Sequence, residues 1–179
     1  MSRDFPEVVV MDRYVLLVKA PKGADVSGFR EEMKALAEEH GLKAELHRCI
    51  GLTVDGVIIY NNGVVLIKRK REPFKDRFAL PGGFVEYGET VEDALRREMK
   101  EETGLDVRIL KLVGVYSDPG RDPRGHTVSV AFLCLGEGKL KAGDDAKEVH
   151  VVPVGEALET ELAFDHSRIL RDALGANRR

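Results

Sequence analysis

The spacing of hydrophobic residues changes along the chain, and it predicts which segments form helices and which form strands. Residues 7–20 are dense in Val, Leu and Tyr and indicate one strand or a bent hairpin. Residues 27–40 carry apolar side chains at helical spacing, and Gly41 follows as a terminator. Residues 42–48 have strand character. Residues 1–48 therefore predict a small β-α-β unit, which would bury little surface by itself.

From residue 49 onward the pattern indicates a larger domain, residues 49–179, with many strands and few helices. Asn61, Asn62 and Gly63 separate two apolar runs and predict a hairpin, because Asn and Gly tolerate positive φ. The expected strands are residues 53–60, 64–70, 77–80, 106–117, 127–136 and 149–154, and the expected helices are residues 90–104 and 165–174. This order predicts an α+β fold in which helices cover both faces of a mixed sheet.

The predicted helix at residues 90–104 carries the most specific information in the chain. On a helical wheel, Glu98, Glu101 and Glu102 extend the apolar stripe that should be buried. The solvated face is already supplied by Glu92, Asp93, Arg96 and Lys100. Clustered carboxylates on a buried stripe repel one another and lose hydration, so an ordinary charged surface is the weaker interpretation. A hard divalent cation, Mg²⁺ or Mn²⁺, would offset that cost.

The same segment resembles the signature of the Nudix hydrolases, and it fits that signature without a gap. The fixed positions are occupied by Gly83, Glu89, Arg97, Glu98, Glu101, Glu102 and Gly104. The resemblance covers residues 49–176 and includes the segment Ala163-Phe-Asp-His166. It implies an α/β/α Nudix sandwich that hydrolyses a nucleoside diphosphate linked to another group, X.

The resemblance also implies which groups bind the metal. They are the side chains of Glu98, Glu101 and Glu102 and the backbone carbonyl of Gly82. Glu98 and Glu102 are one helical turn apart and can reach one ion together. Glu101 can reach a second ion or a metal-bound water. The sequence leaves open which of these carboxylates takes the proton, so all three are candidate catalytic residues.

Four other signature positions are expected to be structural. Glu89 and Arg97 should form a pair that fixes the loop against the helix, because a partly buried Arg prefers a bidentate carboxylate partner. Gly83 lets the backbone turn and approach a ligand closely, and Gly104 can end the helix.

The identity of X depends on residues outside the signature. Pro119 stands fourteen residues after Leu105, and a Pro at about this place is similar to the pattern of the ADP-ribose pyrophosphatase subgroup. Arg121 and Arg124 could bind the diphosphate or the terminal ribose; equally, they could be loop charges paired with neighbouring Asp residues. Arg77 is a further candidate for substrate binding.

Four other positions have weaker signals. A second catalytic acid often comes from a later loop in the family, so Glu148 is a candidate, with Asp144 and Asp145 as rivals. His166 is expected to be structural, with Asp165 or a helix amide as its partner.

The composition of the chain indicates the class of protein and the partners that it is expected to lack. The chain has 179 residues, of which 43% are hydrophobic and 33% charged, as in globular proteins. A net charge of −3 gives no reason to expect nucleic-acid binding. Since no apolar run approaches the ~20 residues that cross a membrane, and residues 1–6 lack an apolar signal core, we expect a cytoplasmic protein without membrane contact. Cys49 and Cys134 should pack as small hydrophobic side chains.

The sequence thus predicts Mg²⁺-dependent hydrolysis of ADP-ribose, or a similar nucleoside diphosphate-X, to AMP and ribose 5-phosphate. One alternative is a pyrophosphatase for nucleoside triphosphates such as 8-oxo-dGTP. An alternative of another class is a module that senses ADP-ribose without hydrolysing it, although that interpretation prefers a degraded signature. The Val/Leu-rich segments of residues 1–48 would suit dimerisation, which makes a homodimer a further expectation.

Overall fold

The computed structural model describes residue 25 and residues 27–42, 50–141 and 146–176. The chain divides into two units, residues 1–46 and residues 47–179. In the first unit the structure describes one helix, α1 (Ser27–Glu39), which confirms the helix expected there. Apart from residue 42, the two strands expected in this unit lie outside the described residues. The proposed β-α-β unit therefore stays a prediction.

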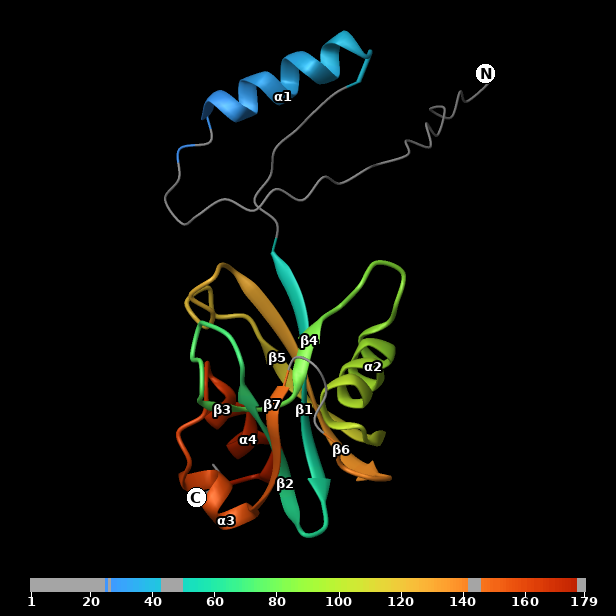
Figure 1. The fold of residues 1–179 in the computed structure, drawn as a ribbon, viewed down its shortest axis with the longest axis vertical. Helices are drawn as coiled ribbons and strands as arrows, with labels where there is room; N and C mark the ends of the chain where they lie inside the picture. Colours follow the sequence, from blue (N-terminus) through green and yellow to red (C-terminus); the bar gives the residue numbers. More distant parts are fainter. Residues whose placement is uncertain (1–24, 26, 43–49, 142–145, 177–179) are drawn as a thin grey trace, which may run out of the picture. The chain divides into compact units, whose positions relative to one another are not determined.

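In the described part of the second unit, seven strands form one mixed sheet (Figure 1). They are β1 (Gly51–Tyr60), β2 (Gly63–Arg69), β3 (Phe78–Ala79), β4 (Gly82–Phe84), β5 (Asp106–Tyr116), β6 (Thr127–Glu137) and β7 (Ala146–Pro153). Five run in the order β3-β2-β1-β6-β5, while β4 pairs with β1 and β7 with β2. Only the β1–β6 pair is parallel among these, so the expected mixed sheet is confirmed.

The hairpin between β1 and β2 shows how the local sequence sets the register. Asn61 and Asn62 adopt φ values of 47° and 63°, and Ile59 then pairs with Val64. The predicted hairpin is confirmed, but Gly63 contributes to it differently from what was expected. It begins β2, and a Cβ placed there would lie 2.7 Å from the carbonyl oxygen of Val152 on β7. Gly63 is therefore required by the neighbouring strand rather than by the turn.

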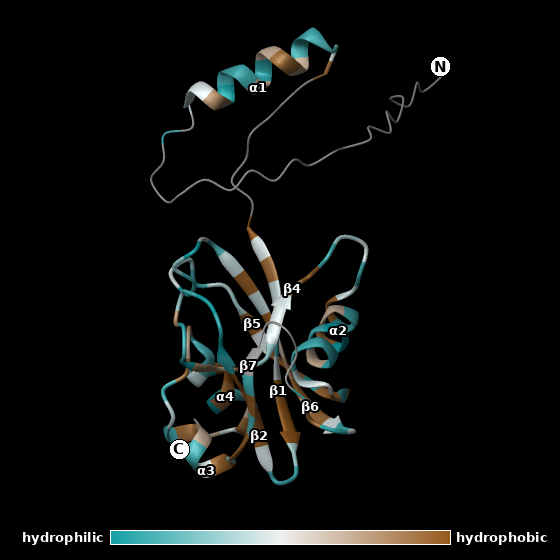
Figure 2. Ribbon diagram, viewed as in Figure 1, coloured by the Kyte–Doolittle hydropathy of each residue, from teal (hydrophilic) through white to brown (hydrophobic). Residues whose placement is uncertain are grey.

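Helices cover both faces of the sheet, as predicted (Figure 1). Helix α2 (Val91–Thr103) buries Ala94, Leu95 and Met99 against one face. The short helix α3 (Val154–Glu159) and α4 (His166–Leu174) pack on the other. Figure 2 shows the resulting distribution, with hydrophobic residues concentrated in the central strands and hydrophilic residues along α2. No helix in the described residues is long and apolar enough to span a membrane.

Strand β1 serves both layers because successive side chains point to opposite faces. Val54 and Ile58 belong to the core beneath α2, and Val57 belongs to the core beneath α3 and α4. Gly56 lies where α2 approaches β1 closely, since a Cβ there would be 2.4 Å from the sulfur of Met99. By the same alternation Asp55 shares the face of Val57. This places a carboxylate among the apolar residues on the α4 side.

Candidate active site

Helix α2 is fixed at both ends by short-range contacts that the sequence predicts. The Thr90 hydroxyl oxygen accepts a hydrogen bond from the Asp93 amide at 3.1 Å, and Gly104 ends the helix with φ 73°. A cavity of about 330 Å³ lies beside the helix. It is lined by Glu98 and Glu102 of α2, by residues 82–84 of β4, and by side chains from β1, β2, the loop before β6 and the segment before α4.

Glu98 is held in a tight space. Its side chain is 14% exposed, and it accepts a 2.8 Å hydrogen bond from Nη1 of Arg97. Burial raises the pKa of Glu98 from its ordinary value, although Arg97 acts in the opposite direction. A Cβ placed on Gly83 would lie 2.2 Å from the Glu98 carboxyl carbon. The glycine is therefore needed for the carboxylate to pack against the β4 backbone.

Glu102 contacts the same strand one turn later. The Gly82 amide donates a hydrogen bond to its Oε2 at 2.8 Å. Gly82 pairs with Asp55 of β1, and a Cβ there would lie 2.2 Å from the carbonyl oxygen of Val54. Glu98 and Glu102 thus both contact or approach the two glycines, which lie in a strand rather than in the loop expected there.

Glu101 does not share this environment, which corrects the expectation that three carboxylates lie on the buried stripe. Its side chain is 60% exposed and lies 3.4 Å from Nη1 of Arg97. The buried face of α2 is centred on Leu95, Met99 and Thr103, so Glu101 falls at its edge, next to Arg97. Within the described ranges, no three acidic, His or Cys side chains already converge as a metal site. The donors lining the cavity, carboxylate and backbone oxygens, nevertheless suit a hard divalent cation.

Arg97 joins the loop of residues 84–89 to α2. Its Nε and Nη2 donate to the two carboxylate oxygens of Glu89 at 3.2 and 2.6 Å, and Nη2 also donates to the Phe84 carbonyl at 3.0 Å. The Glu89 carboxylate additionally accepts a hydrogen bond from the Glu86 amide at 2.7 Å. These contacts lower the pKa of Glu89, and they raise the pKa of Arg97. Glu89 and Arg97 therefore hold the loop against the helix.

Arg121 differs from both expectations for it. Its side chain is 4% exposed, and its Nε and Nη2 donate to the Asp165 carboxylate at 2.7–3.1 Å. Nη2 also lies 3.4 Å from Asp55. Although Arg121 lines the cavity, its donors are directed to the partly buried Asp165, which immediately precedes α4, and to the buried Asp55 of β1, rather than to neighbouring loop residues. Sequence spacing gave no signal for these partners, because they are 44 and 66 residues away.

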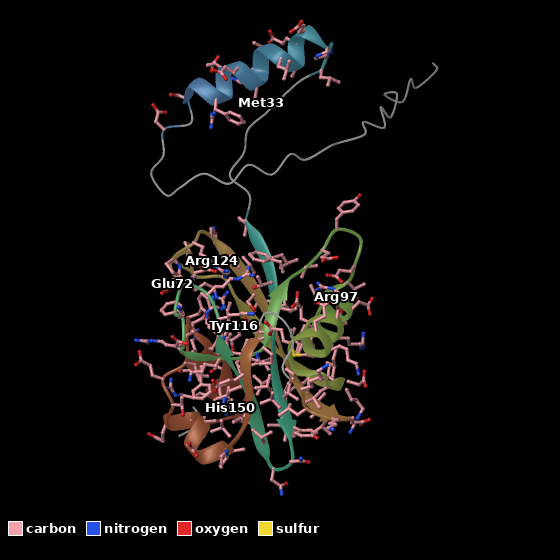
Figure 3. The ribbon with its side chains drawn as sticks, in the orientation of Figure 1. Met33, Glu72, Arg97, Tyr116, Arg124 and His150 are labelled. Atoms are coloured by element: carbon pink, nitrogen blue, oxygen red, sulfur yellow. The ribbon has the colours of Figure 1, made fainter. Side chains whose placement is uncertain are left out.

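Arg124 pairs with a neighbouring Asp, which was one of the two expectations for it, and its substrate-binding role stays a prediction. It forms a bidentate pair with Asp122, as one expectation held, with distances of 2.7–3.1 Å. Its guanidinium also lies over the rings of Phe84 at 5.8 Å and Phe164 at 5.5 Å, and all these residues line the cavity. Figure 3 shows Arg124 and Arg97 on opposite sides of β4 in this view.

Arg69 is a cavity residue that was not singled out from its basic run at residues 68–71. It is partly buried, lies 4.8 Å over the Phe164 ring, and donates through Nε to the Pro73 carbonyl at 2.8 Å. Burial and the nearby charge of Arg124 lower its pKa. No carboxylate in the described part of the chain lies within 4.0 Å of this guanidinium. A partly buried cation next to a second cation favours an anionic ligand.

A buried polar cluster lies at the base of the cavity. His166 accepts a hydrogen bond at Nδ1 from the Leu80 amide at 2.9 Å, and its Nε2 lies 3.5 Å from Asp55. Burial lowers the pKa of His166. Asp55 also accepts a short hydrogen bond from Ser129. The partners of His166 are thus Leu80 and Asp55, not the Asp165 side chain or a helix amide, because the sheet supplies them across the layer.

Other predicted residues lie outside the cavity lining. Arg77 pairs with Glu161 at 2.8 Å, and Pro119 is exposed. Glu148 lies on β7, where it contacts His150 at 2.9 Å and Lys68 at 3.9 Å. Its rivals Asp144 and Asp145 lie outside the described residues, as does Cys49.

Comparisons with known proteins agree with this geometry. Residues 50–173 match the family described as the NUDIX domain. The chain is 50% identical over 147 residues to an ADP-ribose pyrophosphatase of Methanocaldococcus jannaschii, covering 81% of this chain and 85% of that protein. The NUDIX domain of Shewanella oneidensis NrtR, solved with ADP ribose, aligns with a TM-score of 0.67 and 26% identity, covering 73% of this chain and 90% of that one. A bifunctional NMN adenylyltransferase/ADP ribose pyrophosphatase of Francisella tularensis, solved with AMP and a Mn ion, aligns with a TM-score of 0.64 and 29% identity, covering 83% and 47%.

Proposed function

The chain belongs to the Nudix hydrolase family, and we propose that it hydrolyses ADP-ribose to AMP and ribose 5-phosphate with the help of Mg²⁺ or Mn²⁺. One observation carries the proposal: acidic side chains from α2 and arginines from other elements line a single cavity. Binding a diphosphate requires both kinds of side chain. The arginines balance the negative charge of its phosphates, and the carboxylates hold the metal ion that neutralises the remaining charge. The archaeal pyrophosphatase relative supplies the choice of ADP-ribose.

The proposed metal ligands are the carboxylates of Glu98 and Glu102 and the carbonyl of Gly82, with Glu101 within reach from the rim. The bound cation would polarise a phosphoryl oxygen and activate water. The close packing of Glu98 on Gly83 and of Glu102 on Gly82 supports this set, because it keeps the oxygen donors beside one strand.

Glu98 is the strongest candidate to take the proton from the attacking water. Its position, buried in the cavity beside Gly83, would bring its carboxylate to the reacting group. Glu101 and Glu102 are the alternatives on the same helix. Glu148 is a weaker one, because it lies outside the cavity lining.

Arg69 and Arg124 would bind the phosphate oxygens. Both guanidinium groups lie over Phe164, and Arg69 has its main-chain contacts but no carboxylate partner in the described residues. Phe84 is 51% exposed at the cavity and offers an aromatic face to the base or ribose. Arg121 is better explained as a buried support, because its donors already contact Asp165 and Asp55.

The direct test is to incubate the wild-type chain with ADP-ribose and Mg²⁺ and to quantify AMP and ribose 5-phosphate by chromatography and mass spectrometry. We expect both products in equal amounts, and none when EDTA is added. Release of pyrophosphate from 8-oxo-dGTP, with ADP-ribose intact, would select the triphosphate alternative. Tight binding of ADP-ribose without turnover at any divalent ion would select the sensing module.

Three further expectations belong to this proposal. They are a domain boundary near residue 48, a homodimer formed through residues 1–48, and a cytoplasmic location. The cytoplasmic location would place the enzyme among its nucleotide substrates. Sedimentation of the full chain and of a chain beginning at residue 49 tests the dimer. Equal monomeric behaviour of the two would remove it.

A further inference from the structure

We propose that His166 is a positioning residue, which sets the cation-binding backbone at Gly82 through the amide of Leu80. The inference rests on the proposed function only in taking Gly82 as a metal ligand. His166 lies on α4, on the opposite side of the sheet from the acidic helix α2. In this role, His166 connects α4 to the segment Leu80–Gly82, which contacts α2 on the other side of the sheet.

The segment Leu80–Gly82 is held by three hydrogen bonds. The Leu80 amide donates to Nδ1 of His166 at 2.9 Å, the Pro81 carbonyl accepts from the Gly56 amide at 2.9 Å, and the Gly82 amide donates to Glu102 at 2.8 Å. The second bond connects it to the central strand β1, and the first and third connect it to side chains of α4 and α2. Side chains from opposite layers, together with strand β1, thus hold this segment in place.

The His166 contact is shielded from bulk solvent. Leu80 is 2% exposed and His166 is 5% exposed, so an unmet Leu80 amide would remain buried. A second bond lies beside it, because the Ala163 amide donates to the Phe78 carbonyl at 2.8 Å. The segment before α4 therefore runs alongside residues 78–80 and is joined to them at two points.

The structure also fixes the form of the imidazole. A ring nitrogen that accepts from an amide carries no proton, so the neutral ring has its hydrogen on Nε2. Nε2 faces Asp55 at 3.5 Å, and Asp55 is held by Ser129 and Arg121. The buried cluster thus orients His166, and His166 orients Leu80, in the manner by which outer groups orient metal ligands.

A shift of Leu80 would also shift Gly82 by a similar amount. Proline restricts the backbone between them, and Gly82 has no free space toward β1, where a Cβ would lie 2.2 Å from the Val54 carbonyl oxygen. We therefore expect His166→Leu to lower kcat and to weaken Mn²⁺ binding, each by roughly 10–100-fold, as is usual for groups that support metal ligands.

The test compares His166→Leu with His166→Asn and with His40→Asn. The Asn side chain can present its oxygen where Nδ1 lies and so restore the acceptor, whereas Leu has a similar volume without one. His40 is exposed at the end of α1 and serves as the control for removing a His. The measurements are kcat and KM for ADP-ribose, Mn²⁺ affinity by electron paramagnetic resonance without nucleotide, and thermal unfolding.

The expected pattern is a loss of kcat and Mn²⁺ affinity in His166→Leu, recovery to within about 3-fold in His166→Asn, and no change in His40→Asn. If His166→Leu lowered only the melting temperature, or if His166→Asn were as impaired as His166→Leu, the positioning role would be overturned. Because Mn²⁺ affinity is measured without nucleotide, an inert wild type would reject the proposed substrate and leave this test intact.

A measurement on the wild-type chain covers the case in which His166→Leu fails to fold. Long-range ¹H–¹⁵N spectra should show His166 as the neutral form protonated at Nε2, and the Leu80 amide should be protected from hydrogen exchange. A ring protonated at Nδ1, or a rapidly exchanging Leu80 amide, would overturn the proposal.

Discussion

Replacing Gly83 by Ala tests whether the position of Glu98 controls the reaction. The added methyl group would lie 2.2 Å from the Glu98 carboxyl carbon and 2.2 and 2.4 Å from its oxygens. The obstacle is the end of a flexible side chain, so the carboxylate can move while the sheet stays in place. Gly83→Ala should therefore leave the fold intact and change the free energy of unfolding by no more than about 1 kcal/mol.

The required displacement sets the expected loss of activity. Ordinary van der Waals contact begins near 3.4 Å, so the nearest Glu98 atom must move by about 1.2 Å. A displacement of ~1 Å in a reacting geometry costs on the order of 100-fold in rate. We expect kcat for ADP-ribose to fall by about this factor and the apparent affinity for Mg²⁺ to weaken with it.

Two other glycines supply matched controls for this substitution. Gly155 has open space at its Cβ position, so Gly155→Ala should retain both activity and stability. Gly82→Ala should unfold the protein or lower its melting temperature strongly, because the obstacle there is the Val54 backbone oxygen at 2.2 Å. The assay is initial-rate kinetics over a range of Mg²⁺, with thermal unfolding of each variant. Full activity and unchanged Mg²⁺ dependence in Gly83→Ala would refute the role of Glu98.

Further predictions concern the ligand set, the buried ion pairs and one titration. Glu102→Gln should lower kcat/KM by roughly 100-fold or more in initial-rate assays without unfolding the protein, because an amide is a poor ligand for a hard cation. Arg121→Met should lower the free energy of unfolding by about 3–5 kcal/mol, since it leaves the buried Asp55 and the partly buried Asp165 without their cation. Arg77→Met should cost about 1 kcal/mol or less, because its pair with Glu161 is exposed; urea denaturation measures both, and equal costs would contradict the assignment. Burial raises the pKa of Cys134 from 9.0 to about 12. The thiol therefore ionises at lower pH in the unfolded chain than in the folded one, and the free energy of unfolding decreases as pH rises from 9 toward 12. Urea denaturation at several pH values should show a smaller decrease for the Cys134→Ala variant.

Local patterns in the sequence were sufficient for much of the fold. The hairpin at Asn61-Asn62, the cap at Thr90 and the end at Gly104 depend on neighbouring residues only, and all three are present. Strand β4 was missed because Gly82 and Gly83 indicate a turn, whereas they pair with β1 owing to the close approach of Val54 and Glu98. Helix α3 was also missed, since its six residues are too few for a periodic pattern.

The candidate site residues that lie on one helix could be predicted from the sequence, whereas those that come together from distant segments could not. Glu98 and Glu102 follow from spacing along α2. The partnership of Arg121 with Asp55 and Asp165 joins three distant segments, so no local pattern could indicate it. Arg69 stood within a basic run and was distinguished only by its contact with Phe164.

We infer that Glu98, Glu102 and the Gly82 carbonyl bind a divalent cation at the diphosphate of the substrate. Anomalous diffraction from a crystal soaked with Mn²⁺ and a non-hydrolysable methylene analogue of ADP-ribose tests it most directly. The account predicts an anomalous peak bounded by those two carboxylates, with the analogue's diphosphate between the ion and Arg69. A fully bound analogue with no peak beside α2 would contradict it.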